Sequence, residues 1–328
     1  MNAMMIEAEG LHKRFGTTQA LDGLDLAAPH GSVLGVLGPN GAGKTTAVRI
    51  LTTLAHPDAG WARVAGLDVV ADATEVKRNI GVTAQAATVD EVLTGRQNLV
   101  MIGRLSGLPR RQARLRATEL LDRFDLIDAA DRMARTYSGG MRRRLDLAAS
   151  LVMRPPVLFL DEPTTGLDPT SRVRMWNVIR ELIADGVTLL LTTQYLDEAD
   201  ELADRIIVVD HGRGIATGTA AELKRQTGGA RLEVLLTVPH PDARAALAPL
   251  VDGEIMVGYD GRHLQAPVRA MGGLATRIVR ALDDAGVEVD NVEVRQPSLD
   301  DVFFELTGHP TEEPPTAIPD SEREVTPA

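Results

Sequence analysis

The chain has no cysteine among its 328 residues, which excludes disulfide bonds, thiolate zinc sites and cysteine nucleophiles. It also lacks long hydrophobic runs: residues 157–160 form one of the longest, far short of the ~18 residues that a membrane-spanning helix needs. The N-terminal segment has neither the basic region nor the apolar stretch of a secretory signal. If the protein works at a membrane, we expect a partner to bring it there.

Basic residues are outnumbered, with 35 Lys and Arg against 46 Asp and Glu, a net charge of −11. Binding to nucleic acid by bulk electrostatics needs a basic face, so no nucleic-acid partner is expected. The local exception is the run Arg142, Arg143 and Arg144. Aromatic residues make up only 3% of the chain and none is interleaved with this run. We therefore interpret it as a solvated helix face near bound phosphate, not as a site for nucleic acid or anionic lipid.

Short apolar runs alternate with helical stretches up to about residue 227. Their Leu and β-branched content predicts a largely parallel sheet covered on both faces. The strand-like runs are Val33–Leu37, 80–85, Val157–Asp161, Thr188–Thr193 and 206–210. Between the second and third runs we expect an inserted helical subdomain at about 86–150, where apolar residues recur at helical spacing. These residues are Leu115, Leu120, Leu121 and Phe124.

A break at residues 226–229 separates this region from a smaller one. We expect a first domain over 1–229, a small α+β domain over 230–308, and a Pro-rich acidic tail over 309–328 whose composition predicts disorder. In the small domain, 232–238 and 287–294 alternate like strands, and Leu274, Ile278 and Leu282 form a helical stripe. Two interpretations stay open for Val302, Phe303 and Leu306, which are either a partner contact or plain core.

A glycine-rich loop directly follows the strand Val33–Leu37. It reads Gly38, Pro39, Asn40, Gly41, Ala42, Gly43, Lys44 and Thr45, which matches the phosphate-loop pattern. Glycines let backbone N–H groups surround phosphate oxygens, and the following helix offers its positive end. Lys44 would reach the β- and γ-phosphates and the Thr45 hydroxyl would bind Mg²⁺. The alternative is a glycine-rich turn with a solvated lysine.

The apolar run Val157–Asp161 ends on two carboxylates, Asp161 and Glu162. Beside a phosphate loop, Asp161 would hold Mg²⁺ and Glu162 would polarise the attacking water. A strand that ends in acidic residues is common, so this signal gains weight only from the loop.

A second helix start follows Tyr137, where Ser138, Gly139 and Gly140 precede the arginine run. Such a start is either an ordinary N-cap or a second anion-binding site. One ATP does not need two such starts from one chain, so the second could complete the site of a neighbouring copy.

In this order the motifs resemble the nucleotide-binding domain of ATP-binding cassette (ABC) transporters. The loop is similar to their Walker A motif, YSGGM to the LSGGQ-type signature, and VLFLDEP to Walker B. The resemblance implies an α/β P-loop NTPase fold of ABC type, with a mostly parallel sheet, a β-subdomain and an inserted helical subdomain, followed here by the small C-terminal α+β domain. In the family, two such domains pair head-to-tail, with each signature acting on the partner's ATP.

The resemblance also implies roles for individual residues. The catalytic set is Glu162, Gln85, Gln194 and Lys44, and the Mg²⁺ set is Thr45, Gln85 and Asp161. The nucleotide-binding set is Phe15, Gly38, Pro39, Asn40, Gly41, Ala42, Gly43, Lys44, Thr45, Thr46, Ser138, Gly139, Gly140 and Asp168. Phe15 is placed to stack on adenine, or else is a core residue at a strand end.

Gln194 departs from the general family pattern, because the family usually has histidine at this position. A glutamine amide can donate a hydrogen bond to phosphate but cannot become cationic near neutral pH. We hypothesise that Gln194 senses the γ-phosphate and that Glu162 is the main catalytic carboxylate. The segments around Gln194 and Ser138, and the stretch PSLDDVF at 297–303, resemble the daunorubicin-resistance ATP-binding subunits, in which this glutamine is usual.

The resemblance leads to one main functional hypothesis. The chain would bind ATP and Mg²⁺, pair with a second copy of itself, and drive efflux of a hydrophobic drug or antibiotic through a separate membrane permease, at the cytoplasmic face of the membrane. The alternative is a soluble single-cassette ATPase that remodels a ribosome, DNA or a protein. A single phosphate loop, the lack of sustained heptads and the acidic balance favour the pump.

Overall fold

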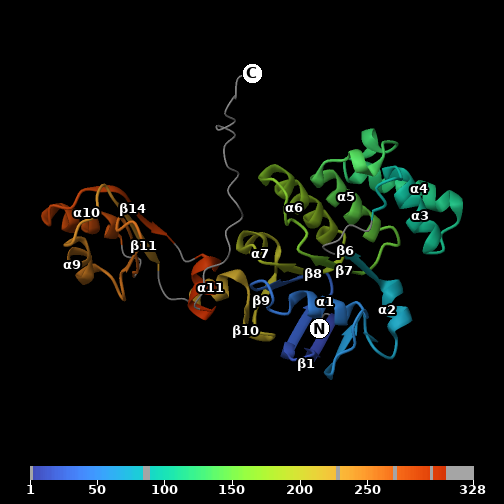
Figure 1. Ribbon diagram of the computed structural model, residues 1–328, viewed down its shortest axis with the longest axis horizontal. Coiled ribbons are helices and arrows are strands. Elements are labelled where there is room, and N and C mark those ends of the chain that lie inside the picture. Colours follow the sequence, from blue (N-terminus) through green and yellow to red (C-terminus); the bar gives the residue numbers. More distant parts are fainter. Residues whose placement is uncertain (1–2, 84–88, 227–229, 269–271, 296–297, 308–328) are drawn as a thin grey trace, which may run out of the picture. The chain divides into compact units, whose positions relative to one another are not determined.

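The structure, a computed structural model, describes residues 3–83, 89–226, 230–268, 272–295 and 298–307. The chain forms two compact units that divide between Thr217 and Gly218 (Figure 1). We expected the boundary after residue 229, about a dozen residues later than the division seen here. The difference arises because α8 (Ala220–Gln226) packs on α11 (Leu299–Thr307) and so belongs to the second unit. The tail expected at 309–328 lies outside the described residues.

The first unit contains two sheets. The antiparallel sheet has the order β2 (Thr18–Pro29), β1 (Met4–Phe15), β4 (Ala59–Val64) and β5 (Leu67–Asp68). The six-stranded sheet has the order β10 (Arg213–Gly218), β9 (Arg205–Asp210), β3 (Val33–Leu37), β8 (Thr188–Thr193), β7 (Val157–Asp161) and β6 (Ile80–Thr83). From β9 to β6 the neighbouring strands are parallel, which confirms the expected parallel sheet. The antiparallel sheet is the expected β-subdomain.

Two hydrophobic cores sandwich the six-stranded sheet, because successive side chains of a strand point to opposite faces. Along β7, Val157 and Phe159 join the core shared with α1 (Lys44–Leu51), whereas Leu158 and Leu160 join the opposite core. The opposite core includes residues of α5 (Gly139–Ser150) and α6 (Pro169–Ala184). The β3, β7 and β8 strands are thus fixed on both faces, and so are the loops that leave their carboxyl ends.

Helices dominate the segment between β6 and β7. After α2 (Ala73–Asn79), which precedes β6, the chain forms α3 (Gly95–Leu105), α4 (Arg110–Arg123), two 3₁₀ turns (Ile127–Ala129 and Ala134–Thr136) and then α5. Thr94 and Gln97 make a reciprocal capping box that starts α3. The apolar residues expected at helical spacing lie on α4 or at its C-cap, and of these Leu120, Leu121 and Phe124 are buried. Leu115 lies on the same helix but is 62% exposed.

The second unit is a small α+β fold. Its antiparallel sheet has the order β12 (Met256–Val257), β13 (His263–Pro267), β11 (Arg231–Leu236) and β14 (Val289–Arg295). Two further helices are α9 (Ala243–Leu247), which continues into a 3₁₀ turn (Ala248–Leu250), and α10 (Leu274–Asp284). The expected stripe on α10 is buried in the core of this unit. In α11, Val302 and Phe303 are buried while Leu306 is exposed, which favours the core interpretation for the first two.

Within the described ranges, no helix combines the length and the apolar character that a bilayer crossing requires.

Candidate functional site

The loop of residues 38–43 joins β3 to α1, and the space around it requires glycine. A Cβ on Gly38 would lie 2.3 Å from the Val209 carbonyl oxygen, and one on Gly43 would lie 2.4 Å from the Ala20 carbonyl oxygen. Gly43 also has a φ of 108°, which L side chains rarely adopt. The loop therefore closes tightly and leads into the N-terminal end of α1, where free N–H groups favour an anion.

Lys44, the first residue of α1, is buried beneath this loop. Its Nζ donates to the carbonyl oxygens of Gly38 at 2.7 Å and Pro39 at 3.0 Å, and lies 3.7 Å from Glu162 Oε1. Burial lowers the pKa of Lys44, and the carboxylates of Glu162 and Asp161 oppose this shift. A cation held at a helix start can pair with phosphate oxygens.

Asp161, at the end of β7, lies beside the first turn of α1. Its Oδ1 accepts hydrogen bonds from Thr192 Oγ1 at 2.5 Å and from Thr45 Oγ1 at 3.3 Å. Mg²⁺ is usually bound by one or two carboxylates together with substrate phosphates, so Thr45 and Asp161 fit a cation that arrives with a nucleotide. Among the described residues, no cluster of three or more His, Asp or Glu side chains could hold a metal ion alone. Gln85, the third expected ligand, lies outside the described residues.

Glu162 follows Asp161 directly, and it is buried. Its backbone adopts the left-handed conformation, with a φ of 49°. Its backbone N–H donates to the Thr192 carbonyl oxygen at 3.0 Å, and its Oε2 accepts from Thr165 Oγ1 at 3.3 Å. A hollow of about 200 Å³ is lined by Glu162 and by residues of the loop and α1, including Lys44 and Thr46. The carboxylate is therefore placed to polarise a water molecule beside a phosphate in this hollow.

Gln194 and Phe15 are two more of the residues expected at the site. Gln194 is half-buried and lines a second hollow, of about 600 Å³, together with Asn40, Glu162 and Gly139. Phe15, at the end of β1, is 47% exposed, and Lys13 Nζ lies 5.5 Å from its ring centroid. This exposure excludes the alternative of a core phenylalanine and leaves the side chain accessible for stacking.

The second helix start is open. Ser138 caps α5, with its Oγ accepting from the Met141 N–H at 3.2 Å. A Cβ on Gly139 would meet no described atom within 4 Å, whereas one on Gly140 would lie 2.8 Å from Ser171 Oγ. Asp168 caps α6 and accepts from the hydroxyl and the N–H of Ser171 at 2.6 and 2.8 Å; these hydrogen bonds lower the pKa of Asp168.

The interpretation of the arginine run as one solvated face was wrong for two of its members. Arg142 is partly exposed and pairs with Glu91 at 3.0 Å. Arg144 turns to the carbonyl oxygen of Phe124 at 2.9 Å, and Arg143 turns inward to the end of β7. Successive residues of a helix point about 100° apart, so three consecutive side chains cannot share one face.

Two residues that support the site were missed by the sequence analysis. Thr192 donates to Asp161 because the register of β7 and β8 sets these residues opposite each other, which strand order alone could have indicated. Glu198, on α7 (Leu196–Leu202), is fully buried, and its Oε1 accepts from Trp176 Nε1 at 3.3 Å. Burial raises the pKa of Glu198, and nearby hydroxyls only partly oppose that shift.

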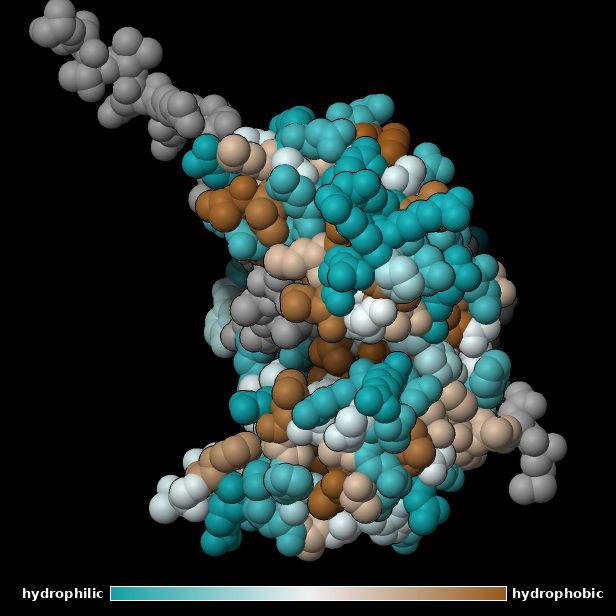
Figure 2. Space-filling view, turned by 90° about the vertical axis from the view of Figure 1, so that its right-hand side faces the viewer, coloured by the Kyte–Doolittle hydropathy of each residue, from teal (hydrophilic) through white to brown (hydrophobic). Residues whose placement is uncertain are grey.

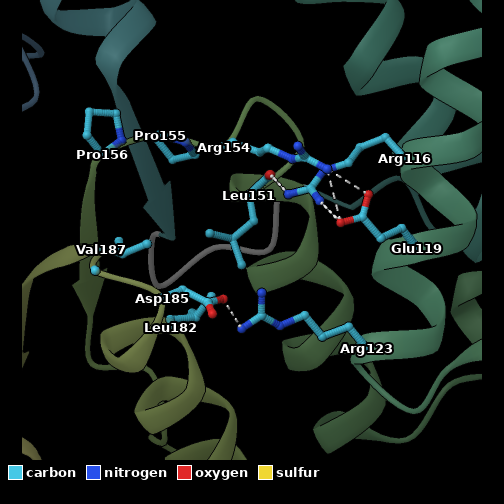
Figure 3. Close-up of a pocket in the computed structure, with 11 residues that line it drawn as sticks. Arg116, Glu119, Arg123, Leu151, Arg154, Pro155, Pro156, Leu182, Asp185 and Val187 are labelled. Carbon is cyan, nitrogen blue, oxygen red and sulfur yellow. Dashed lines mark hydrogen bonds and ion pairs between the residues drawn. The ribbon is translucent and has the colours of Figure 1, made fainter.

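A pocket of about 380 Å³ elsewhere in the first unit is lined mainly by charged residues of α4 and by the connections that precede β7 and β8 (Figure 3). Glu119 accepts from Arg154 at 3.1 Å and pairs with Arg116, while Arg123 pairs with Asp185 at 2.7 Å. The side chains point toward one another in Figure 3. These ion pairs join α4 to the sheet region, and the pocket lies at the amino ends of the strands, away from the phosphate loop.

The phosphate loop, Lys44, Asp161 and Glu162 thus meet at one end of the sheet, an arrangement suited to a nucleotide that arrives with a metal ion. Comparisons with known proteins agree. Residues 21–165 match the family model "ABC transporter", and residues 218–307 match "ATP-binding protein DrrA1-3-like, C-terminal domain". The chain is similar to an ATP-binding cassette of an ABC transporter in its ADP conformation (MJ1267), with a TM-score of 0.62 and 26% identity over 67% of this chain and 92% of that one. It is also similar to cbiO1 from Clostridium perfringens, with a TM-score of 0.62 and 25% identity over 69% and 95%.

The curated relatives match along almost the whole chain. The daunorubicin resistance ATP-binding protein DrrA2 of Streptomyces coeruleorubidus is 56% identical over 95% of this chain and 98% of its own length. The daunorubicin/doxorubicin resistance ATP-binding protein DrrA of Streptomyces peucetius is 51% identical over 98% and 97%. The Nod factor export ATP-binding protein I of Ralstonia nicotianae is 39% identical over 93% and 94%. The chain belongs to the ABC transporter family, among the ATP-binding subunits of the DrrA type, and is an ABC-type ATPase.

Proposed function

We propose that this chain hydrolyses Mg-ATP to drive an efflux transporter for a hydrophobic drug or antibiotic. The observation that carries the chemistry is the meeting of Lys44, Thr45, Asp161 and Glu162 at the carboxyl ends of β3 and β7. Lys44 would pair with phosphate, Thr45 and Asp161 would hold Mg²⁺, and Glu162 would orient water for attack on the γ-phosphate. Gln194 lines the same hollow as Glu162 and would donate its amide N–H to the γ-phosphate.

The cargo assignment rests on the relatives. Two of them are named for daunorubicin resistance, and their likeness to this chain extends through the second unit. The relative named for Nod factor export is less similar. A drug or antibiotic is therefore the cargo class with the stronger support, and a permease in the membrane supplies the pathway for it. The chain then works at the cytoplasmic face of the membrane.

The second helix start supports a homodimer. Gly139 faces open space, while the loop at α1 has its own cation in Lys44. Two copies that close head-to-tail would set Ser138, Gly139 and Gly140 of one copy against the γ-phosphate held by the other, with Asp168 at the same junction. Closure of this kind assembles the catalytic groups and moves the attached partner.

The helical subdomain is the surface that we assign to the permease. Leu105, Leu115 and Met153 are exposed there, although large apolar side chains are usually buried. Figure 2 shows the side of the molecule on which α3 and α4 lie, with hydrophobic spots scattered among hydrophilic residues. Such a mixed surface fits a polar cytoplasmic segment of a membrane protein better than a lipid surface.

ATP hydrolysis and ATP-dependent dimer formation test the proposal. The Glu162→Gln variant should lose hydrolysis by at least about 100-fold yet form a dimer with ATP, seen by light scattering, because the neutral amide no longer activates water. Gln194→Ala should hydrolyse more slowly; an unchanged rate would make Gln194 a spectator. A Glu162→Gln variant that stays monomeric with bound ATP would contradict the dimer.

The transport assignment needs a separate measurement. The tagged chain should copurify from native membranes, in detergent, with a stoichiometric polytopic protein identified by mass spectrometry. Recovery only in the soluble fraction, with ribosomal or DNA-repair proteins, would overturn transport and leave the ATPase assignment standing. No observation in the described structure favours that soluble alternative.

A further inference from the structure

The guanidinium group of Arg143 makes several hydrogen bonds to backbone carbonyl groups, and none of the roles assigned above to the site residues accounts for them. Its side chain is only 14% exposed. Nη2 donates to the carbonyl oxygens of Asp161 at 3.0 Å and Glu162 at 2.8 Å, and Nε donates to that of Pro163 at 2.9 Å. One guanidinium therefore holds three successive carbonyl groups. Asp146 Oδ2, one turn further along α5, lies 3.8 Å away and balances the charge.

These three carbonyl groups belong to the turn that carries the catalytic carboxylate. Glu162 has a φ of 49°, an uncommon conformation for a residue other than glycine, asparagine or aspartate. Strained backbone of this kind persists only where the surroundings hold it in place. On one side, the N–H of Glu162 is bound by the Thr192 carbonyl oxygen at 3.0 Å. On the other side, the carbonyl groups are bound by Arg143.

Arginine is suited to this position in a way that other side chains are not. Its planar fork has five N–H donors in fixed directions, so it can satisfy several carbonyl groups at once. Lysine carries a point charge on a flexible stem, and glutamine offers two donors from one nitrogen. Either replacement would leave part of the turn without a partner and allow the Glu162 carboxylate to shift from Lys44, which lies 3.7 Å away.

We propose that Arg143 is a positioning residue for the catalytic Glu162, acting through the three backbone carbonyl groups of the turn. In this role it acts on the backbone of the turn and fixes the direction in which Glu162 presents its carboxylate. The proposal rests on the proposed function, since it assumes that Glu162 activates water. It also connects α5, the helix that Ser138 caps, with the hydrolysis chemistry of the same chain.

The experiment compares Arg143 with Arg144, its neighbour on the same helix. Arg144 is equally buried, with 12% of its side chain exposed, and its Nη1 also donates to backbone carbonyls, those of Phe124 at 2.9 Å and Asp125 at 3.3 Å. It therefore matches Arg143 in burial and bonding but acts on a different segment. The variants are Arg143→Lys, Arg143→Gln, Arg144→Lys and Arg144→Gln. The readouts are kcat for ATP, the Kd of a fluorescent ATP analogue, and the thermal midpoint.

Displacement of a catalytic group by about 1 Å lowers a rate by up to about 100-fold. For Arg143→Gln we expect kcat to fall between about tenfold and 100-fold with Kd within about twofold of wild type, and for Arg143→Lys a smaller fall. The Arg144 variants should keep their kcat even where the thermal midpoint drops. Equal losses of kcat in both pairs, or a kcat for Arg143→Gln like wild type, would overturn the proposal.

A double variant separates this result from the proposed function itself. In a Glu162→Gln background, Arg143→Gln should cause no further loss of the residual rate, because the group that it positions is gone. A further tenfold loss would mean that Arg143 acts by another route. If Glu162→Gln alone hydrolyses ATP like wild type, the proposed function fails at Glu162, and the proposal for Arg143 fails with it, whatever the Arg143 variants do.

Discussion

The first unit has two helix starts suited to anions, and they are built differently. At α1, the preceding loop is closed against neighbouring backbone at Gly38 and Gly43, which leave no room for a side chain, and Lys44 lies beneath it. At α5, Ser138 provides a side-chain cap and Gly139 faces open space. The nearest arginine along the helix, Arg142, is bound to Glu91 on the surface.

This difference indicates which of the two starts is complete. The α1 start contains backbone donors, a buried cation and a carboxylate for Mg²⁺, so it can bind a nucleotide within one chain. The α5 start offers backbone donors and an accessible glycine, which can add to a phosphate that is already held elsewhere. The predictions below test this division, from the largest expected effect to the smallest.

A matched pair of glycine variants should separate the two starts most strongly. In Gly43→Ala, the new Cβ would clash with the Ala20 carbonyl oxygen at a φ of 108°, so we expect nucleotide affinity to fall by at least about 100-fold. In Gly139→Ala, the Cβ enters open space, so affinity in the monomer should stay the same while ATP-dependent dimerisation is lost. Isothermal titration and light scattering measure the two effects. Equal losses of affinity would refute the division.

Ser138 allows capping to be separated from phosphate binding. Ser138→Asp keeps an acceptor for the Met141 N–H but adds a negative charge, so hydrolysis should fall by at least about tenfold while stability is kept. Ser138→Ala should lower the free energy of unfolding by about 1 kcal/mol, through loss of the cap. Steady-state hydrolysis and denaturant titration measure these effects. Unchanged hydrolysis in Ser138→Asp would mean that α5 has only a structural N-cap.

Variants of Phe15 test whether the adenine base of ATP binds beside the α1 start. Stacking of an aromatic ring on a base contributes ~1–3 kcal/mol, so Phe15→Ala should weaken ATP binding by about tenfold. Phe15→Trp should keep the affinity, since stacking requires only a π-face. Binding of inorganic triphosphate, which has no base, is the control and should be equal in both variants. A parallel loss for triphosphate would point to a disturbed loop.

Glu198, which anchors the helix α6 beside the α5 start, should give the smallest effect, a pH-dependent change in folding stability. Gly140 packs on Ser171 of α6, and Glu198 anchors the same helix through Trp176. The pKa of Glu198 is raised in the folded chain, so folding favours its protonated form. The stability that Glu198 contributes is therefore complete below the ordinary glutamate pKa and is lost as pH rises through the raised value. Glu198→Gln, which cannot ionise, should be more stable than wild type at pH 8, with a smaller difference at pH 5.

Denaturant unfolding of both chains at the two pH values measures this change. A constant difference between wild type and Glu198→Gln would contradict a raised pKa at Glu198.

The sequence predicted those parts of the site that are contiguous in the chain. The phosphate loop, Asp161 with Glu162, and the cap at Ser138 each follow from a short motif, because a strand or a helix start is a local structure. The parallel sheet was predictable as well, from its apolar runs. Thr192 could not be recognised in the same way, since its role depends on β7 and β8 being neighbours.

Arg143 was noticed in the sequence but misinterpreted. Three arginines in a row were interpreted by composition, as a charged surface. Helical geometry sends them in three directions, and only the tertiary fold determines that Arg143 meets the end of β7. Glu198 was missed for a related reason: in an acidic segment nothing in the sequence marks one carboxyl as buried, because its burial comes from packing against Trp176.

The division of the chain into two units, each with its own hydrophobic core, has a practical consequence for spectroscopy. Two units that do not share a core need not unfold in a single transition, so a whole-chain melting curve can mix two events. The chain has two tryptophans, Trp61 and Trp176, and both belong to the first unit. Their emission therefore reports on the unit that carries the nucleotide site, without a signal from the second. The natural protein thus contains its own selective fluorescent reporter, and no label is needed.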